Sequence, residues 1–156
     1  MISEQNYNKL LEEFGDISSF AIYKESKNND IATSDDISFE EAIRNNQKAF
    51  INPSNIILMV NPSAKREHSP DSNFSSFHHS NINDRHLRFL TMKSETFWRN
   101  LYGSYVTDLF PNVVESDMDN VILSIKDDNE KNLRKQSYKK LIKQLEILSQ
   151  DSKEEK

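Results

Sequence analysis

The stretch NIILMVNPS, residues 55–63, runs from a continuous apolar segment into a polar turn, and it decides the fold class. Ile56–Val60 contains no polar residue and has the length of a strand. An apolar run without polar alternation is typical of a central parallel strand that is covered on both faces. Asn61, Pro62 and Ser63 each favour a turn for a separate physical reason, so we expect the strand to end there.

Helical and extended patterns alternate on either side of this run. Apolar residues recur at helical spacing in a first helix, which Ser3 is expected to cap and Gly15 to end in a left-handed conformation. The other predicted strands are 19–24 and 105–110; the other predicted helices begin near residues 38, 83, 116 and 129, with a short helical turn near residue 97. This alternation predicts an α/β fold, with three layers α/β/α around a short, mainly parallel sheet that has residues 56–60 in its middle.

The size and composition of the chain fit one domain. The chain has 156 residues, a formal net charge of -5 and no cysteine. We assign residues 1–150 to a single α/β domain and residues 151–156 to a charged tail that frays. The acidic balance argues against electrostatic capture of nucleic acid or an anionic membrane over the whole surface. The lack of cysteine excludes a disulfide, a thiolate nucleophile and a cysteine-ligated zinc.

Several other classes of protein and site are excluded as well. The longest apolar run, Ile56–Val60, is far shorter than the ~20 residues that span a bilayer, and no basic segment precedes an apolar one at the N-terminus. We therefore expect a cytoplasmic protein without a membrane partner. With only Gly15 and Gly103, neither a phosphate-binding P-loop nor a dinucleotide fingerprint can form. The four histidines lack the spacing of a metal site, so we expect no metal and no cofactor.

Polar residues at the ends of two predicted strands give the candidate site. In an α/β sheet, ligands bind at the carboxyl ends of the strands. Asn61-Pro62-Ser63 and Thr107-Asp108 therefore share one edge of the sheet if their strands are neighbours. An asparagine amide can accept a hydrogen bond from water and donate one to a ligand, so Asn61 can hold a nucleophile in line. A strand-ending turn explains Asn61 equally well.

Other polar residues have ordinary structural explanations. Asn83 or Asp84 can cap the helix that begins there, because an acidic side chain suits the positive end of the helix dipole. Arg85 and Arg88 are expected on the solvent face of that helix, with contact to a phosphate as the alternative. The cations between Lys131 and Lys143 are expected to form a wet face of the last helix, with no role in DNA binding. The predicted inward stripe of that helix comprises Tyr138, Leu141, Ile142, Leu145 and Leu148.

Four short motifs follow one another along the chain: Asn61-Pro62-Ser63 after the apolar strand, Phe77-His78, Asn83–Arg88 and Gly103–Asp108. In this order they resemble the uracil-DNA glycosylase superfamily, in particular its uncharacterised bacterial members. The resemblance covers roughly Gly15 to Leu148. It implies a DNA-repair domain that binds a nucleobase or nucleic acid, such as DNA, and hydrolyses an N-glycosidic bond.

The resemblance also implies roles for individual residues. In some members of the superfamily the first motif reads Gly-(Ile/Met)-Asn-Pro-Gly, and its Asn positions the hydrolytic water. Asn61 and Pro62 match this motif, while Met59 and Ser63 stand where the glycines would be. Asn61 would thus be the catalytic residue, and Phe77 would stack on the base. The other implied substrate contacts are Pro62, Ser63, His78, Thr107 and Asp108.

The C-terminal part departs from the superfamily. Relatives continue past a helix like 129–148 into another strand and a His-containing loop, whereas this sequence stops at Lys156. Three alternatives stay open: a DNA glycosylase, a non-catalytic binding or protein-interaction module on the same scaffold, and part of a longer polypeptide. Without the additional strand, the third strand would leave an exposed sheet edge through which two copies form a homodimer.

Overall fold

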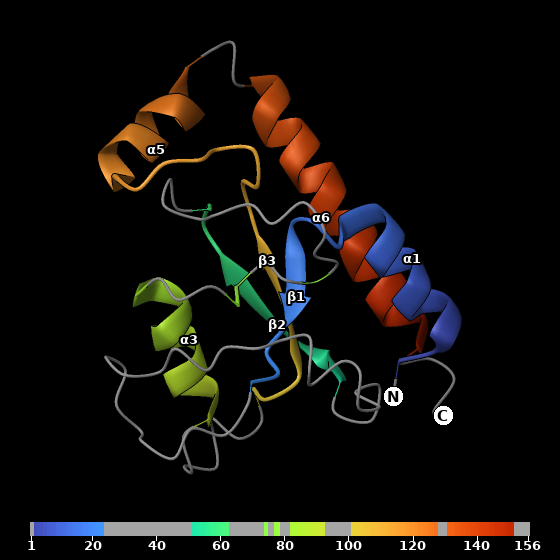
Figure 1. The fold of residues 1–156 in the computed structure, drawn as a ribbon. Helices are drawn as coiled ribbons and strands as arrows, with labels where there is room; N and C mark the ends of the chain where they lie inside the picture. Colours follow the sequence, from blue (N-terminus) through green and yellow to red (C-terminus); the bar gives the residue numbers. More distant parts are fainter. Residues whose placement is uncertain are drawn as a thin grey trace.

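A computed structural model gives the fold, and it describes residues 2–23, 51–62, 74, 77–78, 82–92, 101–127 and 131–151. The elements are α1 (Glu4–Phe14), β1 (Ser18–Phe20), β2 (Asn52–Met59), α3 (Ile82–Met92), β3 (Ser104–Asp108), α5 (Met118–Lys126) and α6 (Lys131–Asp151), drawn in Figure 1. The helix predicted near residue 38 and the helical turn predicted near residue 97 lie outside the described residues. No helix in these segments is both long enough and apolar enough to cross a membrane.

The three described strands form one mixed sheet with β3 at its centre. The strand order is β1-β3-β2, and β3 pairs antiparallel with β1 and parallel with β2. All five residues of β3 are buried. Helices together with this sheet give the predicted α/β character, although one of the two strand pairs is antiparallel.

β2 lies at the edge of the described sheet, so the prediction that it forms the middle is wrong. Its apolar side chains are not covered on both faces: Ile56, Leu58 and the following Val60 are 37%, 46% and 43% exposed. A continuous apolar run does not by itself tell a fully covered strand from one with an open apolar side. The third predicted strand corresponds to β3, which has a strand on each side. The predicted open sheet edge at that strand is therefore also wrong.

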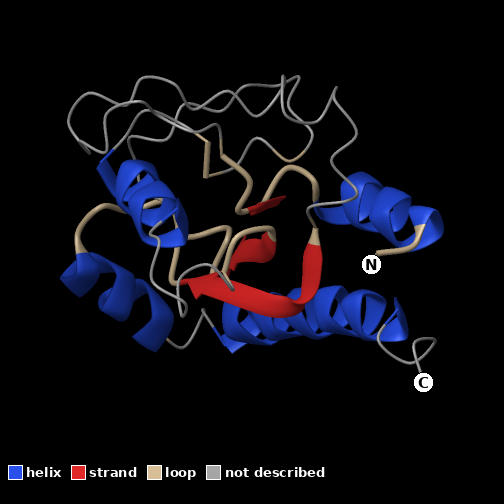
Figure 2. Ribbon diagram, turned by 90° about the horizontal axis from the view of Figure 1, so that it is seen from below, coloured by secondary structure: helices blue, strands red, loops and turns tan. Residues whose placement is uncertain are grey.

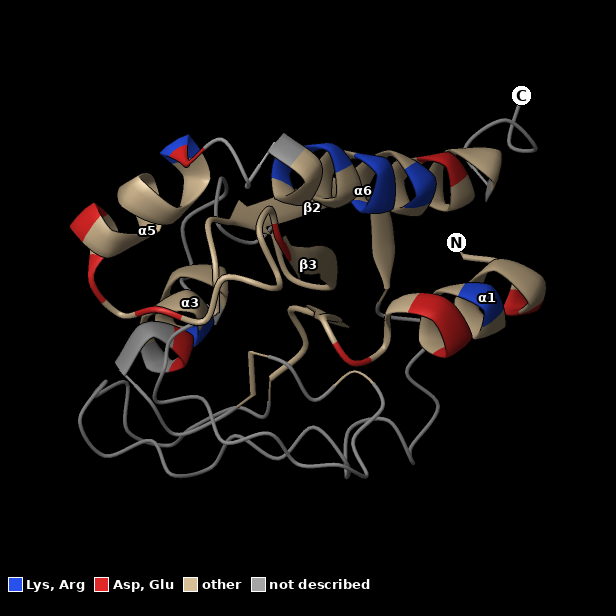
Figure 3. Cartoon of the chain, turned by 90° about the horizontal axis from the view of Figure 1, so that it is seen from above, with Lys and Arg blue, Asp and Glu red and all other residues tan. Residues whose placement is uncertain are grey.

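The two faces of β3 pack against different helices. Tyr105 belongs to an apolar cluster with Phe14 of α1 and Ile147 of α6, whereas Val106 packs in a second cluster with Leu87 of α3. This division follows from strand geometry, because successive side chains point to opposite faces. Figures 2 and 3 show α6 and α3 on opposite sides of the strands.

Helix α1 begins as predicted but ends differently. The Ser3 hydroxyl accepts a hydrogen bond from the Asn6 N–H at 3.3 Å, which confirms the cap. Gly15 has a φ of -62°, so the predicted left-handed ending is wrong. Glycine is needed there for a close approach instead: a Cβ on Gly15 would lie 2.5 Å from the Leu11 carbonyl oxygen.

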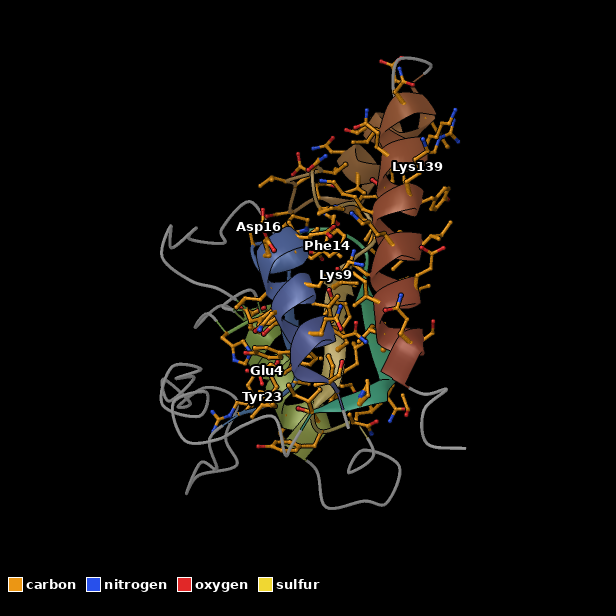
Figure 4. The ribbon with its side chains drawn as sticks, turned by 90° about the vertical axis from the view of Figure 1, so that its right-hand side faces the viewer. Glu4, Lys9, Phe14, Asp16, Tyr23 and Lys139 are labelled. Atoms are coloured by element: carbon orange, nitrogen blue, oxygen red, sulfur yellow. The ribbon has the colours of Figure 1, made fainter. Side chains whose placement is uncertain are left out.

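Helix α6 lies beside α1 (Figure 4). Its inward stripe differs from the predicted one. The buried residues of α6 are Ser137, Gln144, Ile147 and Leu148. Gln144 is held inside by the Tyr105 hydroxyl, which donates to its Oε1 at 2.6 Å. With Gln144 on the inner side, the apolar residues Tyr138, Ile142 and Leu145 lie outward, where they are 48%, 53% and 37% exposed.

The starts of α3 and α5 also differ from the predictions. α3 begins at Ile82, so Asn83 and Asp84 lie inside its first turn and do not cap it. The cap of α5 is Asp117, whose carboxylate accepts a hydrogen bond from the Asp119 N–H at 2.8 Å. Ser116, the neighbouring candidate, precedes the cap by one residue, an ordinary error for a boundary read from sequence.

We expect Gly15→Ala to lower the free energy of unfolding by roughly 1–3 kcal/mol, because its Cβ would overlap the Leu11 carbonyl oxygen. At an unstrained site the same change would raise stability by ~0.4–1 kcal/mol. Urea denaturation followed by circular dichroism gives the sign of the change in the free energy of unfolding. Asn8→Ala, at an exposed position in α1, is the control. A more stable Gly15→Ala variant would contradict the proposed close approach.

Candidate functional site

The carboxyl ends of β2 and β3 form one edge of the sheet. The two strands are parallel, with Met59 opposite Asp108. Just beyond them, the Leu109 N–H donates to the Met59 carbonyl at 2.8 Å. The two strands are therefore neighbours, which was the condition for Asn61-Pro62 and Thr107-Asp108 to share one edge of the sheet. We refer to Asn61, Pro62, Thr107 and Asp108 as the β2–β3 rim.

The amide of Asn61 ties the rim to the loop that follows β3. Its Nδ2 lies 2.7 Å from the Glu115 carbonyl oxygen, 3.1 Å from that of Val113 and 3.0 Å from that of Pro62. All three partners are acceptors, which fixes the donor end of the amide. Asn61 therefore has the structural role of a clamp, and its half-buried side chain holds Oδ1 in one orientation.

The loop that this amide holds is itself ordered by local hydrogen bonds. Buried Pro62 accepts a bond from the Glu115 N–H at 3.2 Å. The exposed Glu115 carboxylate accepts bonds from the N–H groups of Asp117 and Ser116, which lower its pKa. Ser63, the third residue of the predicted motif, lies outside the described residues.

Thr107 and Asp108 lie on opposite faces of the sheet. Strand alternation places Thr107 with Tyr105 on the α6 face, and Asp108 with Val106 on the α3 face. Their exposed fractions are 0% and 2%. Within the described part of the chain, the Thr107 hydroxyl has no hydrogen-bond partner. Among the polar side chains of the rim, Asn61 is therefore more accessible to solvent than Thr107 and Asp108.

Phe77 lies in the core and not at the rim. Its ring is 1% exposed and packs with Ala21, Leu87 and Val106. Its backbone has a φ of 68°, a strained value for a residue with a side chain. The Phe77 carbonyl accepts a bond from the Tyr23 hydroxyl at 3.4 Å. The ring proposed to stack on a base is thus in use as a core residue.

His78 is near the carboxyl end of β1, away from the rim. Its Nε2 lies 3.1 Å from the Phe20 carbonyl oxygen. Its ring centroid is 4.8 Å from that of Tyr23. Because β1 runs antiparallel to β3, Tyr23 lies beyond the amino end of β3, while Asp108 is at its carboxyl end. The six described site residues therefore separate into the rim and the Phe77-His78 segment.

A buried group of polar side chains, which we call the α3 polar cluster, accompanies His78. It comprises Tyr23, His78, Asp84 and Arg88, which are 3%, 7%, 3% and 4% exposed. The prediction that Arg88 faces solvent is therefore wrong. Burial raises the pKa of Tyr23 well above 10.0, the nearby Asp84 carboxylate raises it further, and Arg88 opposes this rise. Tyr23 is accordingly a neutral hydrogen-bond donor at neutral pH.

The sequence contains a signal for this cluster that the prediction missed. Asp84, Leu87, Arg88 and Thr91 recur at i, i+3, i+4 and i+7, and all four are buried. This is the spacing of an inward helix face. Three polar residues at such positions indicate a helix that packs through hydrogen bonds and charges, because buried charge is costly unless it is compensated.

The chemistry that the structure shows at these two places is hydrogen bonding. Among the described residues, no group of three His, Asp or Glu side chains could hold a metal ion. Comparisons with protein-family models, curated proteins and solved structures found no match. The function must therefore be inferred from the geometry of the chain itself.

Asn61→Ala is expected to lower the free energy of unfolding by about 1–3 kcal/mol, because the partly buried carbonyls of Val113 and Glu115 lose their donor. The matched control is Asn120→Ala. Asn120 also contacts Glu115, but through an exposed 3.4 Å bond to the carboxylate, and its loss should change stability by less than ~0.5 kcal/mol. Chemical denaturation measures both variants. Equal effects would show that Asn61 is not a clamp.

We also expect alkaline pH to destabilise the fold through Tyr23. The unfolded chain releases the phenol proton near pH 10.0, whereas the folded chain retains it. The contribution of Tyr23 to the free energy of unfolding should therefore be fully present below that pH. Above it, the free energy of unfolding should fall by about 1.4 kcal/mol per pH unit for each retained proton. Tyr23→Phe should reduce this slope in urea denaturation at several pH values. The half-exposed Tyr138→Phe is the control, and an unchanged slope in Tyr23→Phe would contradict the assignment.

Proposed function

We propose that the chain is a uracil-DNA-glycosylase-like, three-layer α/β domain that binds a nucleobase or nucleic acid at the β2–β3 rim, in the cytoplasm. The observation that carries this proposal is the parallel pairing that brings Asn61-Pro62 beside the end of β3. Ligands of α/β sheets are bound at such strand ends. The ordered motifs from Asn61 to Asp108 supply the chemical class of the ligand.

In the hydrolytic form of this proposal, Asn61 orients a water molecule. Its Nδ2 is occupied by backbone carbonyls, so Oδ1 is the atom that accepts a hydrogen bond from the water. The water oxygen would bond to the sugar carbon as the N-glycosidic bond breaks. The base would leave with the bonding electron pair and acquire the proton that the water gives up. Preorganisation of the amide favours this role.

The second candidate is a non-catalytic binding module on the same scaffold. It is favoured by Phe77, because a ring that is 1% exposed and packed against Val106 offers no open face to a base. It is also favoured by the clamp role of Asn61, which explains that residue without a substrate. The two candidates share the binding site and differ only in turnover.

Fluorescence anisotropy and product analysis with labelled uracil-containing single- and double-stranded DNA test the proposal. We expect the 156-residue chain to bind and Asn61→Ala to lose at least about tenfold in affinity. Asn120→Ala is the control, and circular dichroism establishes that each variant is folded. Release of uracil supports the hydrolytic candidate, while binding without release supports the second. Absence of binding to either DNA and to free uracil would refute both.

A further inference from the structure

Apolar side chains are exposed on one side of β2 and on α6. Ile56 pairs in register with Tyr105, so strand geometry places its side chain and that of Leu58 on the face of the sheet that α6 covers. The helix covers these side chains only in part. The six exposed residues, which we name the β2–α6 flank, are all between 37% and 53% exposed: Ile56, Leu58, Val60, Tyr138, Ile142 and Leu145.

Phe110 connects the part of the flank on β2 with the part on α6. Its backbone N–H donates to the Val60 carbonyl at 2.9 Å, while its ring centroid is 6.3 Å from that of Tyr138. The exposed side chains of the strand and those of the helix are therefore adjacent. Contiguous apolar patches on one side of a domain are characteristic of interaction surfaces.

A row of lysines borders the flank on the side of α1. Lys143 forms a salt bridge with Glu13 of α1, so α1 lies beside α6 on the side of that lysine. Lys139 and Lys135 precede Lys143 at successive i, i+4 spacings, which align side chains along one side of a helix. Both of these lysines are exposed. The flank is therefore apolar toward β2 and cationic toward α1.

The charge of α6 is opposite in sign to that of the whole chain, whose formal net charge is -5. Figure 3 shows Lys and Arg gathered on α6, and Asp and Glu mainly on α1 and around α5. A cationic surface on an acidic chain favours a negatively charged partner. Between residues 132 and 150 the helix has one carboxylate, Glu146, against five cations: Arg134, Lys135, Lys139, Lys140 and Lys143.

The two halves of the flank together restrict the kind of partner. Nucleic acid would meet Ile, Leu and Val side chains, which neither stack on bases nor donate hydrogen bonds to them. An anionic membrane would also meet the acidic residues of α1 beside the lysine row. A second copy of this chain would bring the same excess of cations. An amphipathic helix with carboxylates along one edge of its apolar stripe matches both halves.

We propose that the β2–α6 flank binds an acidic amphipathic helix of a partner protein. The apolar stripe of the partner covers Ile142 and the exposed side chains of β2, and its carboxylates contact Lys135 and Lys139. The contact is made through the side chains of β2 and α6. The interface is distinct from the β2–β3 rim, and it stands whether or not the rim binds nucleic acid.

Fluorescence anisotropy with a labelled synthetic helix tests the interface. The probe has leucine at i, i+3, i+4 and i+7, glutamate along one edge of that stripe, and alanine or glutamine elsewhere. We expect it to bind the 156-residue chain with a Kd of roughly 100 μM or tighter, and a scrambled peptide of the same composition to bind at least about tenfold more weakly. No binding of the probe, or equal binding of the two peptides, would overturn the proposal.

Two matched variants locate the contact. Ile142→Ser removes an apolar side chain from the centre of the flank and should weaken binding of the probe by at least about tenfold. Leu123→Ser is the control, because Leu123 is 65% exposed on α5 and outside the flank. Circular dichroism establishes that both variants are folded. Equal effects of the two changes on binding would contradict the assignment of the flank.

Charge reversal tests the lysine row separately. Lys139→Glu should weaken binding of the acidic probe by roughly two- to fivefold, as loss of an exposed ion pair does. Lys126→Glu, at an exposed position on α5, changes the net charge equally and is the control. The double variant Lys135→Glu with Lys139→Glu should instead prefer a probe with lysine in place of glutamate. Lack of this reversal would refute the role of the row.

Other ligands are distinguished by the same variants. Phosphatidylcholine vesicles that contain phosphatidylserine test a lipid surface, and labelled single- and double-stranded DNA tests nucleic acid. Binding of vesicles or DNA that is lost in Ile142→Ser, without binding of the acidic probe, would assign the flank to that ligand and refute the proposal. DNA binding that is unchanged in Ile142→Ser, together with loss of the probe, would support two separate sites.

Discussion

Burial of β3 on both faces and along both edges is the constraint on which the rest of the structure depends. Each of its five residues is inaccessible to solvent, so the chain must supply a strand on either side and a helix over either face. Its neighbours run in opposite directions. Because β1 and β2 run in opposite directions, the polar residues that follow them lie at opposite ends of β3. The carboxyl ends of β2 and β3 form the rim, while the carboxyl end of β1 leads to Tyr23 at the other end of β3.

Features that depend on local hydrogen bonding could be predicted from the sequence. The Ser3 cap and the strand that precedes Asn61 are examples, because each is set by residues within a few positions. Features that depend on a distant partner could not. Tyr138 lies outward while Gln144 is buried and bonded to Tyr105, a distant contact that no periodicity indicates. The apolar run of β2 predicts a strand covered on both faces, but which strands and helices cover it depends on distant parts of the chain, and Ile56 and Leu58 remain partly exposed.

At the candidate site, too, local features could be predicted from the sequence and features that depend on distant residues could not. The shared edge of Asn61 and Asp108 followed from the general behaviour of parallel strands. The position of Phe77 did not, since its packing against Val106 depends on the path of the intervening chain. Asp84 and Arg88 were within reach of sequence reasoning, because their spacing marks an inward face. Asp84 was instead expected to cap the helix and Arg88 to face solvent, because each expectation rested on the charge of the residue and not on its spacing.

The unequal chemistry of the two sheet faces has a thermal consequence. The α1–α6 side is packed mainly by apolar groups such as Leu10 and Phe14, whereas the α3 side combines apolar residues such as Leu87 with buried Asp84 and Arg88. Hydrophobic attraction weakens on cooling, while hydration of charged groups becomes less favourable on heating. Cold should therefore loosen the α1–α6 layer first, and warming should favour the charged contacts of α3.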